Sequence, residues 1–222
     1  MNAKEILLER ENEIIRLLNI FLDQKLDFII VGGYAIATYK KRFSVDLDMV
    51  IKEEDLIEFE KTCKKEKYAE SYNKEILLLY GEKFKRFEKK IKGLDVSIDF
   101  MINGLVSRST NASWSFDYIK KHSVERELDE SKFLTPKKEL LIAMKFHSGR
   151  LADIRDIIAL MPCNEKNLKM HIEKGNMQKL KESIKKQKAL IEKPQFEDSF
   201  KGIFGVNSYK KDNVDATKQL IQ

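Results

Sequence analysis

The chain has 222 residues, of which 42% are hydrophobic and 35% are charged, and its formal net charge at pH 7 is +6. A chain of this length and composition buries a real core, as one domain or as a small domain with a helical appendage, and is typical of soluble globular proteins. There is no apolar run long enough to span a membrane and no signal-peptide core near the N-terminus, so we expect no membrane association.

The cysteines indicate the cellular compartment, and the net charge indicates the class of binding partner. Cys63 and Cys163 stand far apart without the spacing of metal ligands, so we expect two packing residues in a reducing, cytoplasmic compartment rather than a disulfide. The basic balance suits a polyanionic partner such as RNA, or a nucleotide, although a lysine-rich proteome explains the charge equally well.

The first elements in chain order are a helix, a strand and a glycine turn. Residues 4–22 carry an apolar stripe at helical spacing and predict a helix that covers a sheet. The apolar run 28–31 has the length of a strand and ends at Gly32 and Gly33, after which residues 34–39 suit a packed helix. In this arrangement, backbone N–H groups and a helix N-terminus face an anion.

Two acids follow in a strand pattern. Residues 45–51 alternate, so Asp46 and Asp48 project from the same side of the strand, about 7 Å apart along it. Neighbouring carboxylates raise each other's pKa unless a cation sits between them, and hard oxygen ligands favour Mg²⁺ or Mn²⁺. The pattern therefore predicts a metal site beside a phosphate-binding turn, which together indicate a nucleotide site. The alternative is a glycine turn beside a surface strand that happens to carry two acids.

Gly32-Gly33, twelve intervening residues and then an Asp-Leu-Asp run at Asp46 and Asp48 resemble the signature of the nucleotidyltransferase superfamily related to DNA polymerase β. The resemblance implies a small mixed sheet, two metal ions and a third carboxylate on a neighbouring strand. It also implies an NTP whose α-phosphate is attacked by an acceptor while pyrophosphate leaves. Gly32 and Gly33 would hold the triphosphate.

The third carboxylate is expected in a later strand. Residues 94–102 alternate, with Asp95 and Asp99 on one face. Asp99 is flanked by large apolar residues inside the strand, and we predict that it completes the metal site. Asp95 is the alternative, because strand register cannot be read from the sequence.

The segments around these motifs complete the predicted sheet. Residues 53–67 predict a helix, and 76–80 predict an inner strand that turns at Gly81. The basic residues 84–91, with interleaved aromatics, predict an amphipathic strand, with nucleic-acid contact as the alternative. The remaining segments are predicted as a turn-rich connection over 103–115, whose part 107–113 is a mobile substrate loop or an inert link, a short helix over 114–119 and an edge strand over 122–128.

A boundary is predicted at residues 133–136, where Thr135 can cap a helix and Pro136 fits its first position. Together with the mixed sheet that the superfamily resemblance implies, this boundary predicts an α+β fold, with a nucleotidyltransferase-type mixed β-sheet and flanking helices in residues 1–132. A C-terminal helical subdomain follows in residues 133–222, and after Pro194 we expect a docked but irregular tail. The helices of this subdomain are predicted over 137–148, 150–161, 164–174 and 176–192.

The helical part holds a second charged group. On a helix Asp153 and Asp156 share a face, and a hairpin of helices would bring Lys145 close to one of them. One interpretation is an internal salt bridge that joins two helices. The other is that Lys145 neutralises phosphate charge or orients the acceptor, while an aspartate fixes it in place.

The order of Lys145, Arg150, Asp153 and Asp156 is similar to the C-terminal motif of AbiEii-type nucleotidyltransferases, which are toxins of type IV toxin–antitoxin systems. The resemblance implies Lys145 as a catalytic residue, and Lys145, Arg150 and Asp156 as nucleotide-binding residues. In the superfamily interpretation Arg42 also lies close to the triphosphate or the acceptor, with a solvated turn as the alternative.

These expectations combine into one function. The chain is predicted to be a nucleotidyltransferase in which Asp46, Asp48 and Asp99 bind Mg²⁺ or Mn²⁺. It would transfer a nucleoside monophosphate from an NTP, such as ATP, to RNA, for example a tRNA end, as a toxin with an antitoxin partner. The alternatives are a catalytically silent nucleotide- or RNA-binding module, and transfer to a protein or small-molecule hydroxyl.

Overall fold

The structure is a computed structural model that describes residues 3–71 and 83–220. The chain forms two compact units, and neither is one continuous stretch. The sequence predicts domains at 1–132 and 133–222. Two compact units do not show whether these two parts fold independently, so this division stays a prediction. The first unit contains Met1–Thr38, Phe43–Leu105 and Trp114–Pro136, and the second contains Tyr39–Arg42, Val106–Ser113 and Lys137–Gln222.

The first unit is built on a mixed sheet, whose described strands follow the order β3-β4-β5-β2-β1-β9-β8. β2 runs parallel to β5, and β1 runs parallel to β9, whereas the other neighbours with a described register are antiparallel. The predicted α+β fold with a mixed sheet is therefore confirmed. The strands are β1 (Phe28–Ile30), β2 (Asp46–Ile51), β3 (Ala69–Ser71), β4 (Phe84–Ile91), β5 (Leu94–Ile102), β8 (Ser123–Leu128) and β9 (Ser131–Pro136).

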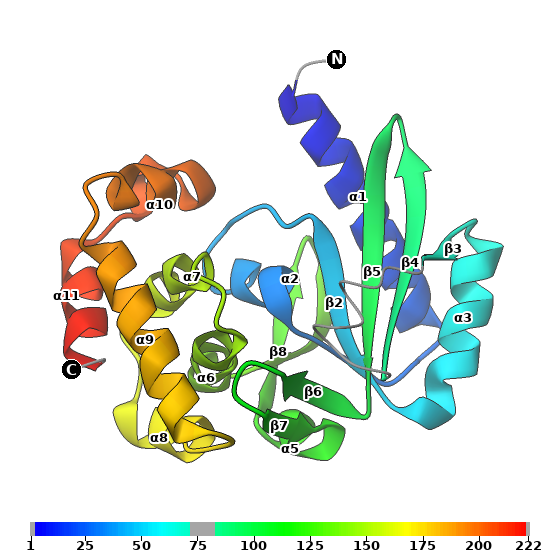
Figure 1. Cartoon of the computed structure of the whole chain (residues 1–222). Coiled ribbons are helices and arrows are strands. Elements are labelled where there is room, and N and C mark those ends of the chain that lie inside the picture. The colour runs from blue at the N-terminus through cyan, green and yellow to red at the C-terminus, as the bar shows by residue number, and fades with distance from the viewer. Residues whose placement is uncertain (1–2, 72–82, 221–222) are drawn as a thin grey trace. The chain divides into compact units, whose positions relative to one another are not determined.

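Helices α1 (Ala3–Asp23) and α3 (Leu56–Lys65) pack on one face of this sheet (Figure 1). Their aromatic rings meet there: the ring centroid of Phe21 lies 5.1 Å from that of Phe59 and 6.3 Å from that of Phe100 on β5. Burying a side chain of this kind stabilises the fold by about 1.5–3 kcal/mol. Because Phe100 faces these helices, its neighbour Asp99 projects from the opposite face of β5.

A tight turn between β4 and β5 sets their register. Lys92 and Gly93 both have positive φ, +49° and +86°, as a two-residue I′ hairpin turn requires. From this turn the antiparallel ladder places Arg86 opposite Asp99. On the other side of β5, the parallel ladder places Asp99 beside Asp48. The turn therefore helps to decide which side chains share the face away from α1 and α3.

Short elements connect the strands of the first unit, and most agree with the sequence. The predicted helix over 53–67 is present as a 3₁₀ turn and α3, and the predicted short helix and edge strand before the boundary are present as α5 and β8. The predicted strand over 76–80 and its turn at Gly81 lie outside the described residues. The short elements are α2 (Gly32–Ala37), η1 (Glu53–Asp55) and α5 (Phe116–Lys121).

The prediction that Thr135 and Pro136 open a helix is wrong. Both end strand β9, which pairs with β1 and β8, and the next helix begins at Lys138. The reason is the alternation of the segment: Ser131, Phe133 and Thr135 are buried on one face of the sheet, and this pattern outweighs the local capping signal.

The second unit is helical, as predicted, and α6 packs against α7, α8 and α9. The prediction of an irregular tail is wrong, because two further helices follow Pro194. Phe196, Phe200 and Phe204 recur every four residues and are all buried, so one apolar stripe holds a helix despite Gly202. The helices are α6 (Lys138–Ser148), α7 (Asp153–Leu160), α8 (Glu165–Ile172), α9 (Met177–Ile191), α10 (Phe196–Phe204) and α11 (Lys211–Leu220), with a 3₁₀ turn η2 (Val206–Ser208).

The connection over 103–115 contains a hairpin of β6 (Gly104–Ser107) and β7 (Ala112–Ser115). Its tip belongs to the second unit, where Thr110 Oγ1 lies 2.7 Å from Nδ1 of the buried His147. The other ring nitrogen of His147 lies 2.8 Å from the Ile172 carbonyl oxygen. Burial lowers the pKa of the His147 side chain. These buried contacts argue against the mobile substrate loop that was one of two interpretations.

Cys63 and Cys163 are free, as predicted. Of the helices that the structure describes, none combines the length and the apolar character that crossing a membrane requires.

Candidate functional site

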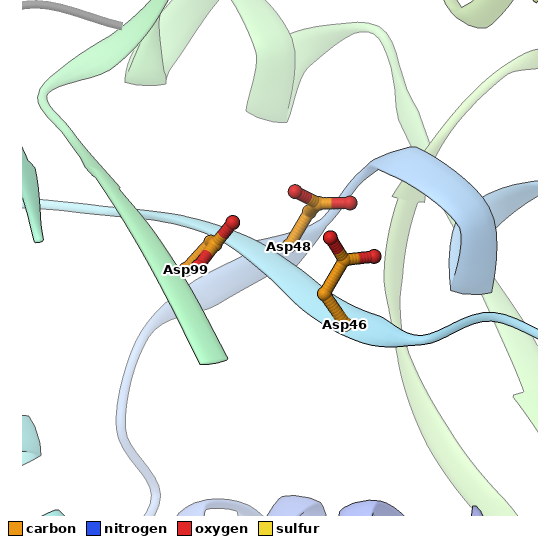
Figure 2. A group of neighbouring side chains, drawn as sticks. All are labelled: Asp46, Asp48 and Asp99. Carbon is orange, nitrogen blue, oxygen red and sulfur yellow. The ribbon is translucent and has the colours of Figure 1, made fainter. Parts of the chain in front are cut away.

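Three carboxylates converge on the sheet face that projects away from α1 and α3. Asp46 and Asp48 come from β2, Asp99 comes from the neighbouring β5, and the three side chains gather at one spot (Figure 2). One oxygen of each carboxylate lies within 4.8 Å of an oxygen of both others. Asp99 is buried, whereas Asp46 and Asp48 are partly exposed, so solvent reaches the cluster at the two carboxylates of β2.

The register of β5 explains the choice of the third acid. Asp99 pairs with Asp48 along the parallel ladder. Asp95 lies near the end of the β4–β5 hairpin, where its exposed carboxylate is 3.5 Å from Lys90 Nζ. The structure thus brings Asp99, and not Asp95, to Asp46 and Asp48.

Gly32 lies directly against this cluster. Its φ is +62°, and a Cβ added there would stand 1.8 Å from Asp48 Oδ2, which is far inside van der Waals contact. The backbone is also tied at this point, because Val31 N donates to the Asp48 carbonyl oxygen over 3.0 Å. The close approach to Asp48 therefore requires glycine at position 32, a steric reason beyond the phosphate-binding role expected from the sequence. Gly33 follows, buried in α2.

Arg86 on β4 is a residue of this site that the sequence reasoning missed. Its Nε and Nη2 donate to different oxygens of Asp99, each over 2.6 Å, and Nη2 lies 3.8 Å from Asp46 Oδ2. A signal was present, because counting back from a two-residue turn at 92–93 pairs Arg86 with Asp99. Burial raises the pKa of Asp99 to about 6, against the opposing effect of Arg86.

This donor set fits a hard divalent cation. The three clustered carboxylates, two of which lie beside the Arg86 guanidinium, carry more negative than positive charge, and a cation among them relieves their mutual repulsion. Carboxylate oxygens are the ligands that Mg²⁺ and Mn²⁺ prefer. The residues present are therefore suited to the predicted metal.

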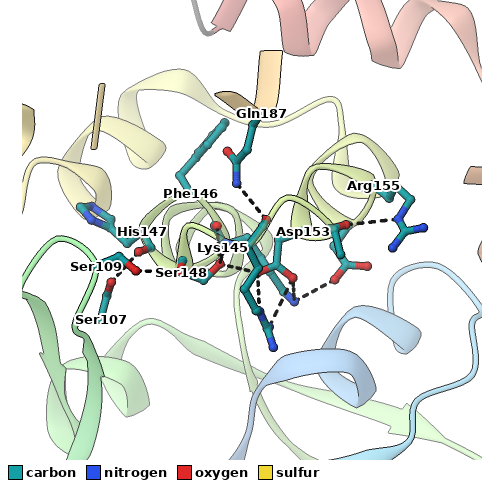
Figure 3. A network of polar contacts seen from close by, with 12 residues as sticks. Ser107, Ser109, Lys145, Phe146, His147, Ser148, Asp153, Arg155 and Gln187 are labelled. Carbon is teal, nitrogen blue, oxygen red and sulfur yellow. Dashed lines mark hydrogen bonds and ion pairs between the residues drawn. The ribbon is translucent and has the colours of Figure 1, made fainter. Parts of the chain in front are cut away.

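The second unit holds a buried ion-pair cluster (Figure 3). Lys145 Nζ of α6 donates to Asp153 Oδ1 and to Asp156 Oδ2 of α7, each over 2.8 Å, and less than a tenth of each side chain is exposed. The predicted helix hairpin that joins Lys145 to these aspartates is confirmed. Burial, which raises the pKa of Asp153, is outweighed by Lys145 and Arg150, so its pKa lies below the usual value.

Two arginines complete this cluster. Arg42 pairs with Asp156 and lies over the ring of Phe204, 5.8 Å from its centroid, and both of these contacts are within the helical unit. Arg150 Nε lies 3.0 Å from Asp153 Oδ2, and 57% of its side chain is exposed. Of these residues, Arg150 is the one with most of its side chain in solvent.

Comparison with known proteins concerns the fold. No protein-family model matches the sequence, and no curated protein matches it. A solved structure from H. pylori, assigned as a nucleotidyltransferase, has a TM-score of 0.54 and 13% identity, and the match covers 100% of this chain and 95% of that one. This likeness shows that the chain has the nucleotidyltransferase fold.

Two other solved structures are similar to a lower degree. The lincomycin-bound lincosamide antibiotic adenylyltransferase LnuA has a TM-score of 0.48 and 18% identity, over 72% of this chain and 97% of its own. ANT(2″)-Ia in complex with adenylyl-2″-tobramycin has a TM-score of 0.43 and 13% identity, over 95% of both chains.

Proposed function

We propose that this protein is a metal-dependent nucleotidyltransferase, which transfers a nucleoside monophosphate from an NTP to a hydroxyl group and releases pyrophosphate. The observation that carries the proposal is the convergence of Asp46, Asp48 and Asp99 beside Gly32. The nucleotidyltransferase fold supports it independently.

The residues of the first unit have distinct roles in this proposal. Asp46, Asp48 and Asp99 hold Mg²⁺ or Mn²⁺, and Asp99 also helps to take the proton from the acceptor hydroxyl. A divalent cation bound there neutralises phosphate charge and favours in-line attack on the α-phosphate. Gly32 and Gly33 hold the triphosphate through their backbone N–H groups.

We propose nucleotide-binding roles for Arg42, Lys145, Arg150 and Asp156, as the family resemblance implies. The exposure of Arg150 supports direct contact with a phosphate. Lys145 is held in one place by two carboxylates, and Asp156 is shared between Lys145 and Arg42. In this proposal Lys145 offsets charge that builds on the phosphates, and Asp156 keeps the two cations in position.

The distribution of charge supports RNA as the acceptor. Residues 137–222 contain 18 Lys and Arg against 11 Asp and Glu, whereas residues 1–136 contain 24 against 25. The excess positive charge therefore belongs to residues 137–222, where α9 alone carries five lysines. Such a concentration is the electrostatic footprint of a protein that binds a polyanion. Modification of a tRNA end by a toxin with an antitoxin partner is the most specific form of this proposal.

A protein or small-molecule hydroxyl is the second acceptor class. It is the class to which lincomycin and tobramycin belong, the antibiotics present in the LnuA and ANT(2″)-Ia structures. A module that binds nucleotide or RNA without transfer is the remaining alternative. These proposals share the carboxylate site and differ in the product formed.

The test is to incubate the protein with each α-³²P-labelled NTP and Mg²⁺, together with total RNA, with protein, or with a panel of aminoglycosides and lincosamides. Label that migrates with RNA on a denaturing gel and disappears with RNase supports the RNA acceptor. Label on a protein band or on a small molecule supports the second class. Calorimetry that shows NTP binding without dependence on Mg²⁺, combined with no transfer, supports the silent module.

The site is tested by Asp46→Asn together with Asp48→Asn. Metal ions supply several kcal/mol of transition-state stabilisation, so we expect transfer to fall by about a thousandfold or more. Asp95→Asn is the matched control, because it removes an exposed carboxylate from the same sheet outside the cluster. Transfer that survives the double substitution refutes the proposal.

A further inference from the structure

Arg86 holds two of the three clustered carboxylates at once. Its guanidinium makes two parallel hydrogen bonds to Asp99, each over 2.6 Å, and one of the same nitrogens lies 3.8 Å from Asp46. The Asp99 side chain is 2% exposed and that of Arg86 is 17% exposed, so water screens this pair only weakly. The planar fork of arginine matches a carboxylate in this two-pronged way, which fixes orientation as well as charge.

The burial of Asp99 explains why such a partner is needed. A carboxylate removed from water is strongly destabilised unless a cation and hydrogen bonds replace its solvation. Asp46 and Asp48 add like charge within 4.8 Å and increase that cost. In a protein without bound metal, Arg86 supplies the compensating charge at this point.

The positive charge of Arg86 also opposes the binding of a metal ion. A divalent cation that binds Asp46 and Asp99 would enter the field of a guanidinium already in contact with both, and like charges at short range repel. The two cations therefore compete for the same carboxylate oxygens.

We propose that Arg86 is a built-in counter-ion of the metal site, which holds Asp99 in place before a divalent cation binds and yields part of this contact when it does. The inference rests on the proposed function, because it assumes that the carboxylates bind metal. Arg86 acts through Asp99 and Asp46, so it is a positioning residue. Its presence keeps the site assembled and lowers the affinity of the site for metal.

The experiment measures Mn²⁺ binding by isothermal titration calorimetry, and thermal unfolding with EDTA or Mn²⁺, for the full chain and for Arg86→Gln. We expect the variant to bind Mn²⁺ about tenfold more tightly, because the competing cation is gone. We also expect a lower melting temperature in EDTA and a larger rise on addition of Mn²⁺ than in the wild type.

The chain offers a matched control on the same two strands. Lys90 of β4 lies opposite Asp95 of β5, 3.5 Å from its carboxylate, in a pair that is mostly exposed and lies outside the carboxylate cluster. Lys90→Gln should match the wild type in Mn²⁺ affinity and in both melting temperatures. Arg86→Lys keeps the charge and loses the fork, so its Mn²⁺ affinity should lie between those of the wild type and Arg86→Gln.

The outcomes separate the inference from the proposed function. If Arg86 only joins β4 to β5, Arg86→Gln lowers the melting temperature equally in EDTA and Mn²⁺ and leaves the Mn²⁺ affinity unchanged, which overturns the inference. Weaker Mn²⁺ binding overturns it too. If Arg86→Gln does not fold, Arg86→Lys decides in the same way: tighter Mn²⁺ binding than the wild type supports the inference, and equal or weaker binding overturns it. A wild-type protein that binds no Mn²⁺ overturns the proposed function itself.

Discussion

Two charged clusters of this protein have opposite balances of acidic and basic side chains: acids are in excess in one and bases in the other. In the first unit, three carboxylates of β2 and β5 are clustered, and two of them pair with one guanidinium of β4. In the second unit, two carboxylates of α7 are held by one lysine and two arginines. The carboxylate cluster consists of Asp46, Asp48, Asp99 and Arg86, and the Lys145 cluster consists of Lys145, Asp153, Asp156, Arg42 and Arg150.

The two clusters differ in whether their acids are already paired with cations and shielded from solvent. The carboxylate cluster has excess acid, and the Asp46 side chain is 37% exposed, so a cation from solution can complete it. In the Lys145 cluster both aspartates already have two or more cationic partners and are 5% exposed. A buried and satisfied cluster of this kind is destabilised mainly by removal of a partner. The comparison therefore predicts that changes in the first cluster mainly weaken metal binding and activity. Changes in the second cluster should lower stability as well as disturb the proposed nucleotide contacts.

Among single substitutions, the largest effect is expected from Gly32→Ala, which inserts a methyl group against the carboxylate cluster. The new Cβ would stand 1.8 Å from Asp48 Oδ2, and the positive φ adds strain. Asp48 must move away from Asp46 and Asp99, and a displacement of about 1 Å costs about a hundredfold in catalysis. We expect at least this loss in nucleotide transfer, together with weaker Mn²⁺ binding by calorimetry.

Gly202→Ala is the control for this substitution. Apart from its two chain neighbours and the backbone of α10 itself, no atom of the residues that the structure describes lies within 4 Å of a Cβ at Gly202, which is inside α10. Alanine is favoured over glycine in a helix by about 1 kcal/mol, so this variant should keep wild-type activity and equal or greater stability. Wild-type Mn²⁺ affinity in Gly32→Ala would show that Asp48 does not belong to the metal site.

Lys145→Met should lower stability more than any exposed lysine substitution. It removes the cation that bridges Asp153 and Asp156, and breaking a buried pair costs about 3–5 kcal/mol. Urea denaturation measures the change in the free energy of unfolding. Lys169→Met is the control, because the Lys169–Glu173 pair is exposed and is worth at most about 0.5 kcal/mol.

The outcome for Lys145→Met can also contradict the contrast between the two clusters. A loss of stability below about 1 kcal/mol, far under the range for a buried pair, would show that Lys145 does not stabilise the helical unit, and loss of nucleotide transfer in the same variant would leave it only the proposed role at the nucleotide.

A smaller effect is expected in the pH dependence of stability. The pKa of Asp153 in the folded protein lies below its usual value of 3.8, because Lys145 and Arg150 outweigh the effect of burial. The ionised carboxylate therefore contributes stability above pH 3.8, and this contribution is lost as the pH falls from 3.8 through the folded-state pKa. Asp153→Asn should cost about 2–3 kcal/mol at pH 7, with a difference from the wild type that shrinks below pH 3.8. Urea denaturation between pH 7 and pH 3 measures this, and a difference that stays constant with pH would contradict it.

Whether a prediction from the sequence was confirmed or wrong depends on how far apart in the chain the residues lie that determine the element. The alternation over 45–51 and 94–102 and the helical stripes over 137–192 involve contiguous residues, and the structure confirms strands and helices there. The apolar neighbours of Asp99 favoured it, with Asp95 as the alternative, and the structure places Asp99 in the cluster. Thr135 and Pro136 misled, because a local capping signal competed with a strand pattern that only pairing with β1 and β8 stabilises.

By itself the sequence determined the periodic elements, the shared face of Asp46 and Asp48 and the turn at Gly32, since these depend on the geometry of neighbouring residues. The tertiary structure shows that Arg86, which a two-residue turn at 92–93 already pairs with Asp99, clasps its carboxylate. It was needed to show that Arg42 joins the helical unit and that the tip of the β6–β7 hairpin packs on His147. These contacts join residues that are 13, 114 and 37 positions apart. Strand register and helix packing, which local propensity does not encode, bring them together.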